Sequence, residues 1–199
     1  MKKISIFLAT ILTILSFNVQ AKENEMNKKL VVYFSKAGKQ YSVGNVAKGN
    51  TVKVAEIIAE KTGADVFEVK VKNDTYPKEY EPLTEVAKEE QEKRLRPEIL
   101  GGVDNFGDYD VVFVGSPVWW GDMPMALYTF IERYDWDGKT VVPFVTHEGS
   151  GLSSIPENIK NATKAKVLPG LAIFGHEAQN DVEKTGEKVA NWLKQNKLD

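Results

Sequence analysis

The chain contains no cysteine and only two histidines, His147 and His176, among its 199 residues. The absence of cysteine excludes disulfide bonds, thiol chemistry and thiolate ligation of an iron–sulfur cluster. Two histidines far apart in the sequence disfavour a clustered zinc site. Any redox chemistry of this protein must therefore come from an organic cofactor or from a partner.

Long apolar runs are also scarce, since the only one lies at the N-terminus. Residues 4–17 are mostly apolar, Lys2 and Lys3 precede them, and Val19-Gln-Ala21 offers small residues at the −3 and −1 positions of a cleavage site. This pattern predicts a secretory signal peptide over residues 1–21 rather than a membrane-spanning helix. The protein is thus expected to be exported to the periplasm or beyond, with an uncleaved tether as the alternative.

Positive charge does not predominate in the predicted mature protein. Removal of Lys2 and Lys3 leaves 24 basic against 28 acidic residues, a net charge of −4. Nucleic acids and anionic membranes reward basic patches, so this balance disfavours both as partners. The length suits one domain, which we place at 29–199 after a short polar leader at 22–28.

Apolar and amphipathic segments alternate along the rest of the chain. Strands are predicted over 30–34, 65–71, 110–115, 140–146 and 167–174, the last broken by Pro169-Gly170. Helices are predicted over 51–62, 76–95, 122–134, 149–161 and 181–197, and a long loop over 35–50. Such alternation is typical of an α/β fold, with a parallel sheet covered by helices on both faces.

The helices carry recognisable start and stop signals. Asn50 or Thr51 is expected to cap the first helix, which Gly63 ends. Asp122 is expected to cap a later helix that has Pro124 in its first turn. The charge run within 76–95 is interpreted as a solvated helix face.

The strand over 110–115 leads into two adjacent tryptophans, Trp119 and Trp120. The carboxyl ends of parallel strands are where open α/β sheets bind ligands, and large planar side chains suit a flat aromatic molecule. The alternative is that both tryptophans are core or subunit contacts.

The first strand and the first helix together suggest an anion site. Ser35 follows the strand, and Asn50 and Thr51 open the helix, whose free amides and dipole favour a phosphate. An ordinary capped helix is the alternative. The segment 44–51 is spaced like a nucleotide-triphosphate loop, but Asn50 stands where that loop needs lysine, which argues against nucleotide hydrolysis.

Together these segments resemble the flavodoxin family, over about residues 29–197. The resemblance lies in Val31-Val-Tyr-Phe-Ser35, Gly49-Asn-Thr51, Gly115-Ser-Pro-Val-Trp-Trp-Gly121 and Pro143-Phe-Val-Thr-His-Glu-Gly-Ser-Gly151. It implies a flavodoxin-like doubly wound five-stranded sheet of order 2-1-3-4-5, with FMN at the switch point between strands 1 and 3. The segment Lys39–Lys48 departs from the family pattern as an insertion in the phosphate loop.

The resemblance also implies roles for individual residues. Trp120 would stack on the isoalloxazine ring, and Gly121 would offer its carbonyl to flavin N5. Negative charge on Asp122 and Glu148 would make the reduced flavin a stronger reductant. The implied cofactor-binding residues are Ser35, Ala37, Asn50, Thr51, Ser116, Pro117, Val118, Trp119, Trp120, Gly121, Thr146, His147, Glu148, Gly149 and Gly151.

Three functions follow from this resemblance. The first is an exported FMN-binding electron carrier that exchanges electrons with a redox partner protein or a small donor or acceptor. The second is an FMN-dependent NAD(P)H oxidoreductase acting on quinones or nitro compounds, and the third is a non-redox binding module that has lost the flavin. His147 would either carry a proton near the ring or satisfy loop amides, while His176 is expected to be structural.

Overall fold

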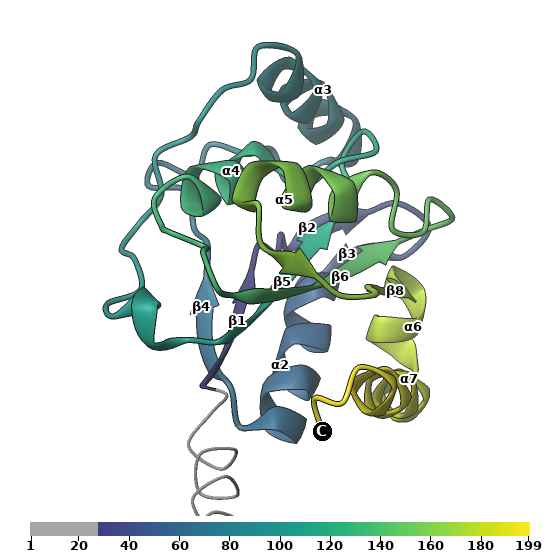
Figure 1. Cartoon of the computed structure of the whole chain (residues 1–199). Coiled ribbons are helices and arrows are strands. Elements are labelled where there is room, and N and C mark those ends of the chain that lie inside the picture. Colours follow the sequence, from purple (N-terminus) through teal and green to yellow (C-terminus); the bar gives the residue numbers. More distant parts are fainter. Residues whose placement is uncertain (1–27) are drawn as a thin grey trace, which may run out of the picture.

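The computed structural model describes residues 28–199. The predicted signal peptide and most of the polar leader lie outside the described residues. Within them, a parallel sheet lies between two layers of helices (Figure 1). In this part of the chain no helix is both long and apolar enough to cross a membrane.

The main sheet confirms the predicted strand order. Its order is β4-β1-β5-β6, and β7 and β8 both pair with β6 at the far edge. Every pairing in it is parallel. The strands are β1 (Lys29–Tyr33), β4 (Asp65–Glu68), β5 (Val111–Pro117), β6 (Thr140–His147), β7 (Lys166–Val167) and β8 (Leu171–Phe174). β7 and β8 together form the fifth predicted strand, which is divided at Pro169 because proline has no N–H for the ladder.

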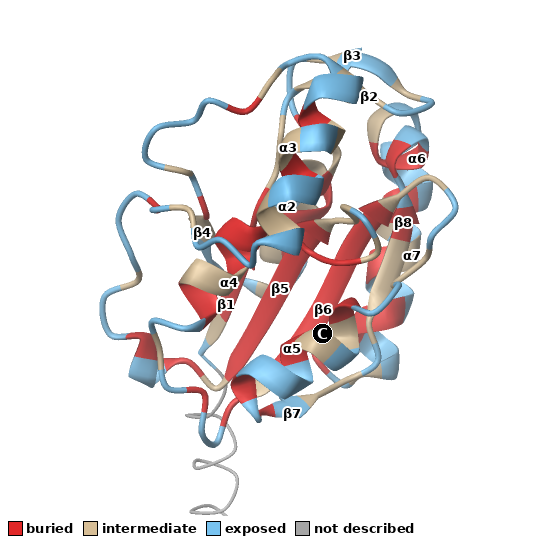
Figure 2. Cartoon of the chain, turned by 90° about the horizontal axis from the view of Figure 1, so that it is seen from above, coloured by how far each residue is buried: buried red, intermediate tan, exposed pale blue. Residues whose placement is uncertain are grey.

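The helices are distributed over both faces of this sheet. One face packs against α2, α6 and α7, and the other against α4 and α5, with α3 at the rim (Figure 1). The helices are α2 (Asn50–Thr62), α3 (Tyr80–Glu92), the 3₁₀ turn η1 (Phe106–Asp108), α4 (Met125–Ile131), α5 (Ile155–Thr163), α6 (Gly175–Asn180) and α7 (Val182–Gln195). The central strands β1, β5 and β6 are buried between the layers (Figure 2).

Two elements correct the sequence prediction. The predicted loop over 35–50 contains a small antiparallel hairpin, β2 (Gly38–Gln40) and β3 (Gly44–Val46). Such short strands lack the apolar alternation that reveals a strand in a sequence. The short helix α6 was also missed, because six residues are too few to show helical periodicity.

Both predicted N-caps are wrong as well, whereas Gly63 ends α2 as predicted. The N-cap of α2 is Gly49, and that of α4 is Pro124. The Asp122 carboxylate is engaged elsewhere, since its Oδ1 accepts from the Met123 amide at 2.7 Å and its Oδ2 from the Tyr128 hydroxyl at 2.8 Å. Burial and this carboxylate raise the pKa of Tyr128, so the hydroxyl keeps its proton and the bond.

Candidate functional site

A cleft of about 460 Å³ opens where β5 and β6 end and α2 begins. This volume lies in the range of small-molecule and cofactor sites. The predicted site residues that line it are Asn50, Thr51, Pro117, Val118, Trp119, Trp120, Thr146, His147 and Glu148. Within residues 28–199, no cluster of three or more potential metal ligands was found.

At one end of the cleft lies the N-terminus of α2. The N-cap Gly49 has no side chain to bond the first amides of the helix, which favours an anion there. A Cβ at Gly49 would lie 2.3 Å from Ser35 Oγ and 2.6 Å from Lys36 O. The close crossing of two backbone segments therefore requires glycine at this position.

Two hydroxyl contacts connect this helix end to the sheet. Ser35 Oγ accepts from the Val52 amide at 3.2 Å, and the hydroxyls of Thr51 and Thr146 lie 2.8 Å apart. Both threonines are buried and line the cleft. The structure thus brings the end of β6 to the start of α2, 95 residues away in the sequence.

Six predicted residues are not part of the cleft lining, namely Ser35, Ala37, Ser116, Gly121, Gly149 and Gly151. Ser35 and Ala37 border a neighbouring hollow beside β4 instead. Ser116 is fully buried, and its hydroxyl donates to the Pro117 carbonyl at 2.6 Å. Lys36 borders both spaces, but its ammonium group lies 2.8 Å from the Asp74 carboxylate.

The two tryptophans also line the cleft, in a tight turn after β5. Trp119 and Asp122 exchange backbone hydrogen bonds of 2.8 and 3.0 Å, and φ is +50° at Trp120 and +77° at Gly121. A positive φ is rare for a bulky residue and marks a position that the surroundings hold in place. Here the Trp120 indole donates to Thr84 O on α3 at 2.8 Å.

The two indoles differ in their surroundings. Trp119 packs edge-on against Phe34 and Tyr76, with ring centroids 5.3 and 5.5 Å away. Trp120 remains 52% exposed. The expected core contact therefore fits Trp119, and the expected contact with a flat aromatic ligand fits Trp120.

The backbone carbonyl of Gly121, which follows the two tryptophans, already accepts hydrogen bonds. Gly121 O accepts from the Ser154 amide at 3.2 Å and from the Ser154 hydroxyl at 2.6 Å. Ser154, which is the N-cap of α5, was not among the predicted site residues. The only feature of the sequence that pointed to Ser154 was its position just before an amphipathic segment.

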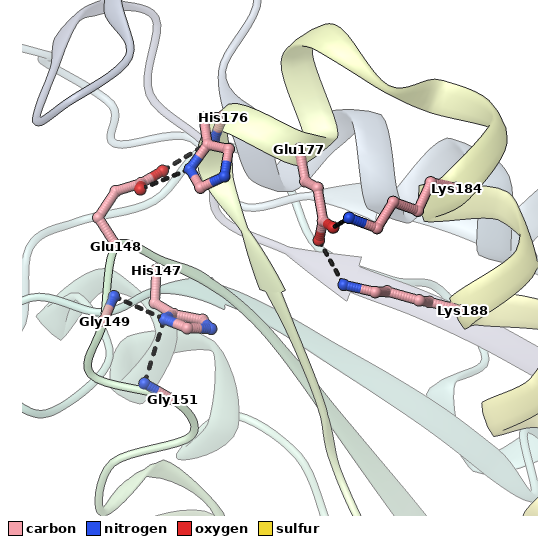
Figure 3. A network of polar contacts seen from close by, with 8 residues as sticks. All are labelled: His147, Glu148, Gly149, Gly151, His176, Glu177, Lys184 and Lys188. Carbon is pink, nitrogen blue, oxygen red and sulfur yellow. Dashed lines mark hydrogen bonds and ion pairs between the residues drawn. The ribbon is translucent and has the colours of Figure 1, made fainter.

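The loop after β6 is organised around His147. The imidazole Nδ1 accepts from the Gly149 amide at 2.9 Å and from the Gly151 amide at 3.2 Å (Figure 3). A nitrogen that accepts two bonds carries no proton, so the neutral ring is protonated on Nε2. Burial lowers the pKa of His147 and favours this neutral form. Two of the predicted cofactor-binding residues, Gly149 and Gly151, thus donate their amides to the imidazole.

Glu148 points from this loop toward α6. Its carboxylate accepts from the His176 amide at 2.7 Å and lies 2.8 Å from His176 Nδ1 (Figure 3). The Phe174 ring lies between the two imidazoles, with centroids 4.5 Å from His147 and 5.2 Å from His176. His176 was expected to be structural, and the structure makes it a direct contact of a predicted site residue.

A second wall of the cleft was missed by the sequence analysis. The hairpin and α3 contribute Gln40, Tyr41, Tyr80, Leu83, Thr84 and Ala87. Leu83 and Ala87 are four positions apart and therefore share one helix face, which was the available signal within the charge run. Tyr41 and Tyr80 meet at a centroid distance of 5.6 Å.

Comparison with known proteins agrees with this geometry. A family model described as flavodoxin matches residues 28–196. The chain therefore belongs to the flavodoxin family, which confirms the resemblance, the fold and FMN as the cofactor. Among curated proteins none matches.

Similar solved structures have also been described as flavoproteins. A candidate flavoprotein from Bacteroides eggerthii is 26% identical, over 85% of this chain and 98% of that one, with a TM-score of 0.63. One from Bacteroides uniformis is 24% identical over 84% and 98%, with a TM-score of 0.64. A Lactobacillus acidophilus flavoprotein in complex with FMN is 23% identical over 77% and 97%, with a TM-score of 0.58. At these identities the last two support the fold alone.

Proposed function

We propose that this protein is an exported electron carrier that binds FMN in the cleft between α2 and the ends of β5 and β6. The observation that carries the proposal is one cleft lined by both the N-terminus of α2 and the exposed Trp120 indole. An anion site and an aromatic surface in one cleft suit a ligand with a phosphate and a flat ring. Membership of the flavodoxin family supports the same assignment.

Bound FMN would supply one- or two-electron redox chemistry, and the protein would bind and orient it. The amides of Asn50 and Thr51 would hold the phosphate, with Ser35 and Ala37 near the same helix end. Pro117, Val118 and Trp119 would line the ring, and Trp120 would stack on it. The loop from Thr146 to Gly151 would close the far edge against water. Ser116 would act through its backbone, because its hydroxyl is already bonded.

If FMN binds as proposed, hydrogen bonds in two loops of the cleft must break. Gly149 and Gly151 donate to His147 Nδ1, so their amides can bind a flavin only by leaving the imidazole. The Gly121 carbonyl would likewise have to leave Ser154 to reach another donor. Glycine makes such a peptide rotation possible at little steric cost.

Binding tests this proposal directly. The mature chain, residues 22–199, is prepared without flavin and titrated with FMN while flavin fluorescence is recorded. We expect stoichiometric quenching and a yellow protein after gel filtration, because stacking on an indole quenches the flavin. Failure to retain the chromophore would refute an FMN carrier and leave the non-redox binding module.

Export is a further part of the proposal, supported by the N-terminal pattern of residues 1–21. Mass spectrometry of the protein from the cell envelope should give a mature chain that begins at Lys22. Recovery of the intact chain in the cytoplasm would contradict export. Recovery of the intact chain in the membrane fraction would favour the uncleaved tether.

The second candidate is an FMN-dependent oxidoreductase for small aromatic acceptors. The observation that favours it is the aromatic wall at the cleft mouth, where Tyr41 is 58% exposed beside Tyr80. Flat molecules stack on such rings. Rapid mixing of the FMN-loaded protein with NADH or NADPH distinguishes the two functions. Flavin bleaching faster than that of free FMN favours the enzyme, and its absence favours the carrier.

A further inference from the structure

The two ends of the flavin site are contributed by segments that are distant in the sequence, yet both contact α6. Asn50 opens α2 at the phosphate end, and Glu148 follows β6 at the ring end. α6 bonds to both through different residues, Gln179 and His176. These two residues were not among the predicted site residues.

Gln179 determines which edge Asn50 presents. Its Nε2 donates to Asn50 Oδ1 at 2.8 Å and to Lys48 O at 2.8 Å. Because an amide nitrogen can only donate, the Asn50 carbonyl must face Gln179, and the Asn50 NH₂ group must turn the other way. Asn50 lines the cleft, and its NH₂ group lies beside Gly175, so this orientation leaves a donor rather than an acceptor free at that part of the cleft.

His176 restrains Glu148 in a comparable way. The His176 amide and Nδ1 both contact the Glu148 carboxylate, whose side chain is only 14% exposed. A carboxylate bonded at both oxygens has little freedom to rotate. The loop that begins with Glu148 is thereby tied to α6.

Gly175 lies where the contacts of Asn50 and of Glu148 with α6 meet. A Cβ on this residue would be 2.3 Å from Asn50 Nδ2 and 3.0 Å from Glu148 Oε1. The two site residues therefore approach the same point of the α6 backbone from different segments. Only a residue without a side chain leaves both in place.

α6 is itself anchored to the scaffold. Glu177 is 6% exposed, and its two oxygens lie 2.5 Å from the ammonium groups of Lys184 and Lys188 on α7 (Figure 3). Hydrogen bonds from these lysines lower the pKa of Glu177, which keeps the pairing charged. A short helix fixed in this way can hold its contacts in a constant geometry.

We propose that α6 is the positioning element of the flavin site, with two separate arms. Gln179 fixes the amide orientation of Asn50 beside the flavin phosphate, and His176 holds Glu148 against α6 and thereby places its loop beside the ring. The inference rests on the proposed function, since it concerns the same cleft. Neither residue needs to touch the cofactor.

Comparison of FMN with riboflavin separates the two arms, because riboflavin has the ring without the phosphate. We expect Gln179→Met to weaken FMN by about two- to tenfold, the worth of one oriented hydrogen bond, and to leave riboflavin within about twofold. We expect His176→Leu to weaken both flavins by the same factor. His176→Asn should restore binding, because its amide nitrogen can replace Nδ1 as the donor.

Dissociation constants come from flavin fluorescence quenching, with urea unfolding of each flavin-free variant as the check on folding. Asn180→Ala serves as the matched control, since Asn180 is an exposed residue of the same helix. Equal losses of FMN and riboflavin in Gln179→Met, or losses no larger than in the control, would overturn the two-arm inference. Failure of the parent protein to bind either flavin would overturn the proposed function, and this inference with it.

Discussion

The two walls of the cleft are built from different interactions. On the side of α6 and the loop after β6, hydrogen bonds hold the side chains of His147 and Glu148. On the side of the hairpin and α3, aromatic rings predominate, and Tyr41 and Trp120 are each more than half exposed. The hydrogen-bonded wall, which we call the polar wall, holds its side chains in fixed directions. The aromatic wall is an accessible apolar surface.

This difference is informative because the two interactions have different tolerances. Hydrogen bonds weaken steeply with misalignment, so a wall built from them specifies one orientation of its loops. Stacked or tilted rings remain favourable over a range of angles and distances. The polar wall therefore suits a permanently held cofactor, and the aromatic wall suits ligands or partners that come and go.

The largest expected effect comes from crowding the polar wall. Gly175→Ala should weaken FMN by about tenfold or more, because the new methyl group displaces Asn50 and Glu148, and overpacking typically costs about 1–3 kcal/mol. Fluorescence titration measures the loss. Gly186→Ala in α7 is the control, since nothing lies within 4 Å of its Cβ position. That change should stabilise the protein by about 0.5–1 kcal/mol. Equal behaviour of the two variants would show that the polar wall tolerates rearrangement.

A smaller effect is expected from truncation in the aromatic wall. Trp120→Ala should weaken FMN by about 1 kcal/mol, roughly fivefold, because ring stacking is lost. Its effect on the free energy of unfolding should be small, because the indole is 52% exposed. Trp120→Phe should retain part of the affinity. Unchanged FMN binding in Trp120→Ala would assign the stacking role to another ring.

The polar wall should also respond to pH through His147. Burial lowers the pKa of its imidazole below the unfolded value of about 6.5. As pH falls below that value, the unfolded chain gains a proton that the folded ring resists, so the free energy of unfolding decreases. Urea unfolding from pH 7.5 downward measures this slope. His147→Asn keeps an acceptor for the loop amides without titrating, so its slope should be shallower, and an identical slope would refute the assignment.

The smallest effect is expected from the ion pair between the hairpin and α3. Lys39 and Glu79 lie 3.7 Å apart, and both side chains are more than half exposed. Lys39→Ala should change the free energy of unfolding by less than about 1 kcal/mol, because water and salt screen exposed pairs. Urea unfolding tests this, with FMN affinity as a second measure. A larger loss would mean that charge, rather than ring contact, holds the aromatic wall.

The sequence predicted the fold and the half of the site at the ends of β5 and β6. It did not predict the half of the site that the hairpin and α3 form. The strand order, which the flavodoxin resemblance implied, was confirmed. The residues at the ends of β5 and β6 were found because each directly follows a buried strand. Tyr41 and Tyr80 were missed, because nothing local indicates that an insertion and a charged helix meet over the cleft.

Some local patterns were also misleading. Asn50 has the chemistry of a helix cap, yet its side chain bonds to Gln179, 129 residues away. Ser116 has a hydroxyl at the right strand end, but the hydroxyl bonds within its own strand. In both cases the hydrogen-bond partner that the fold brings next to the polar group, rather than the residue type alone, determined the role of that group.

The sequence by itself determined a flavodoxin-like sheet, its strand order and the edge at which a ligand binds. Hydrophobic periodicity determined the alternating strands and helices, and the motifs at the strand ends carried the flavodoxin resemblance that implied the strand order. Both are local properties of the chain. Only the tertiary structure decided that α6 connects Asn50 with Glu148 and that Trp120, rather than Trp119, remains exposed. Such contacts depend on the packing of distant segments, and their directions are set when the layers close on the sheet.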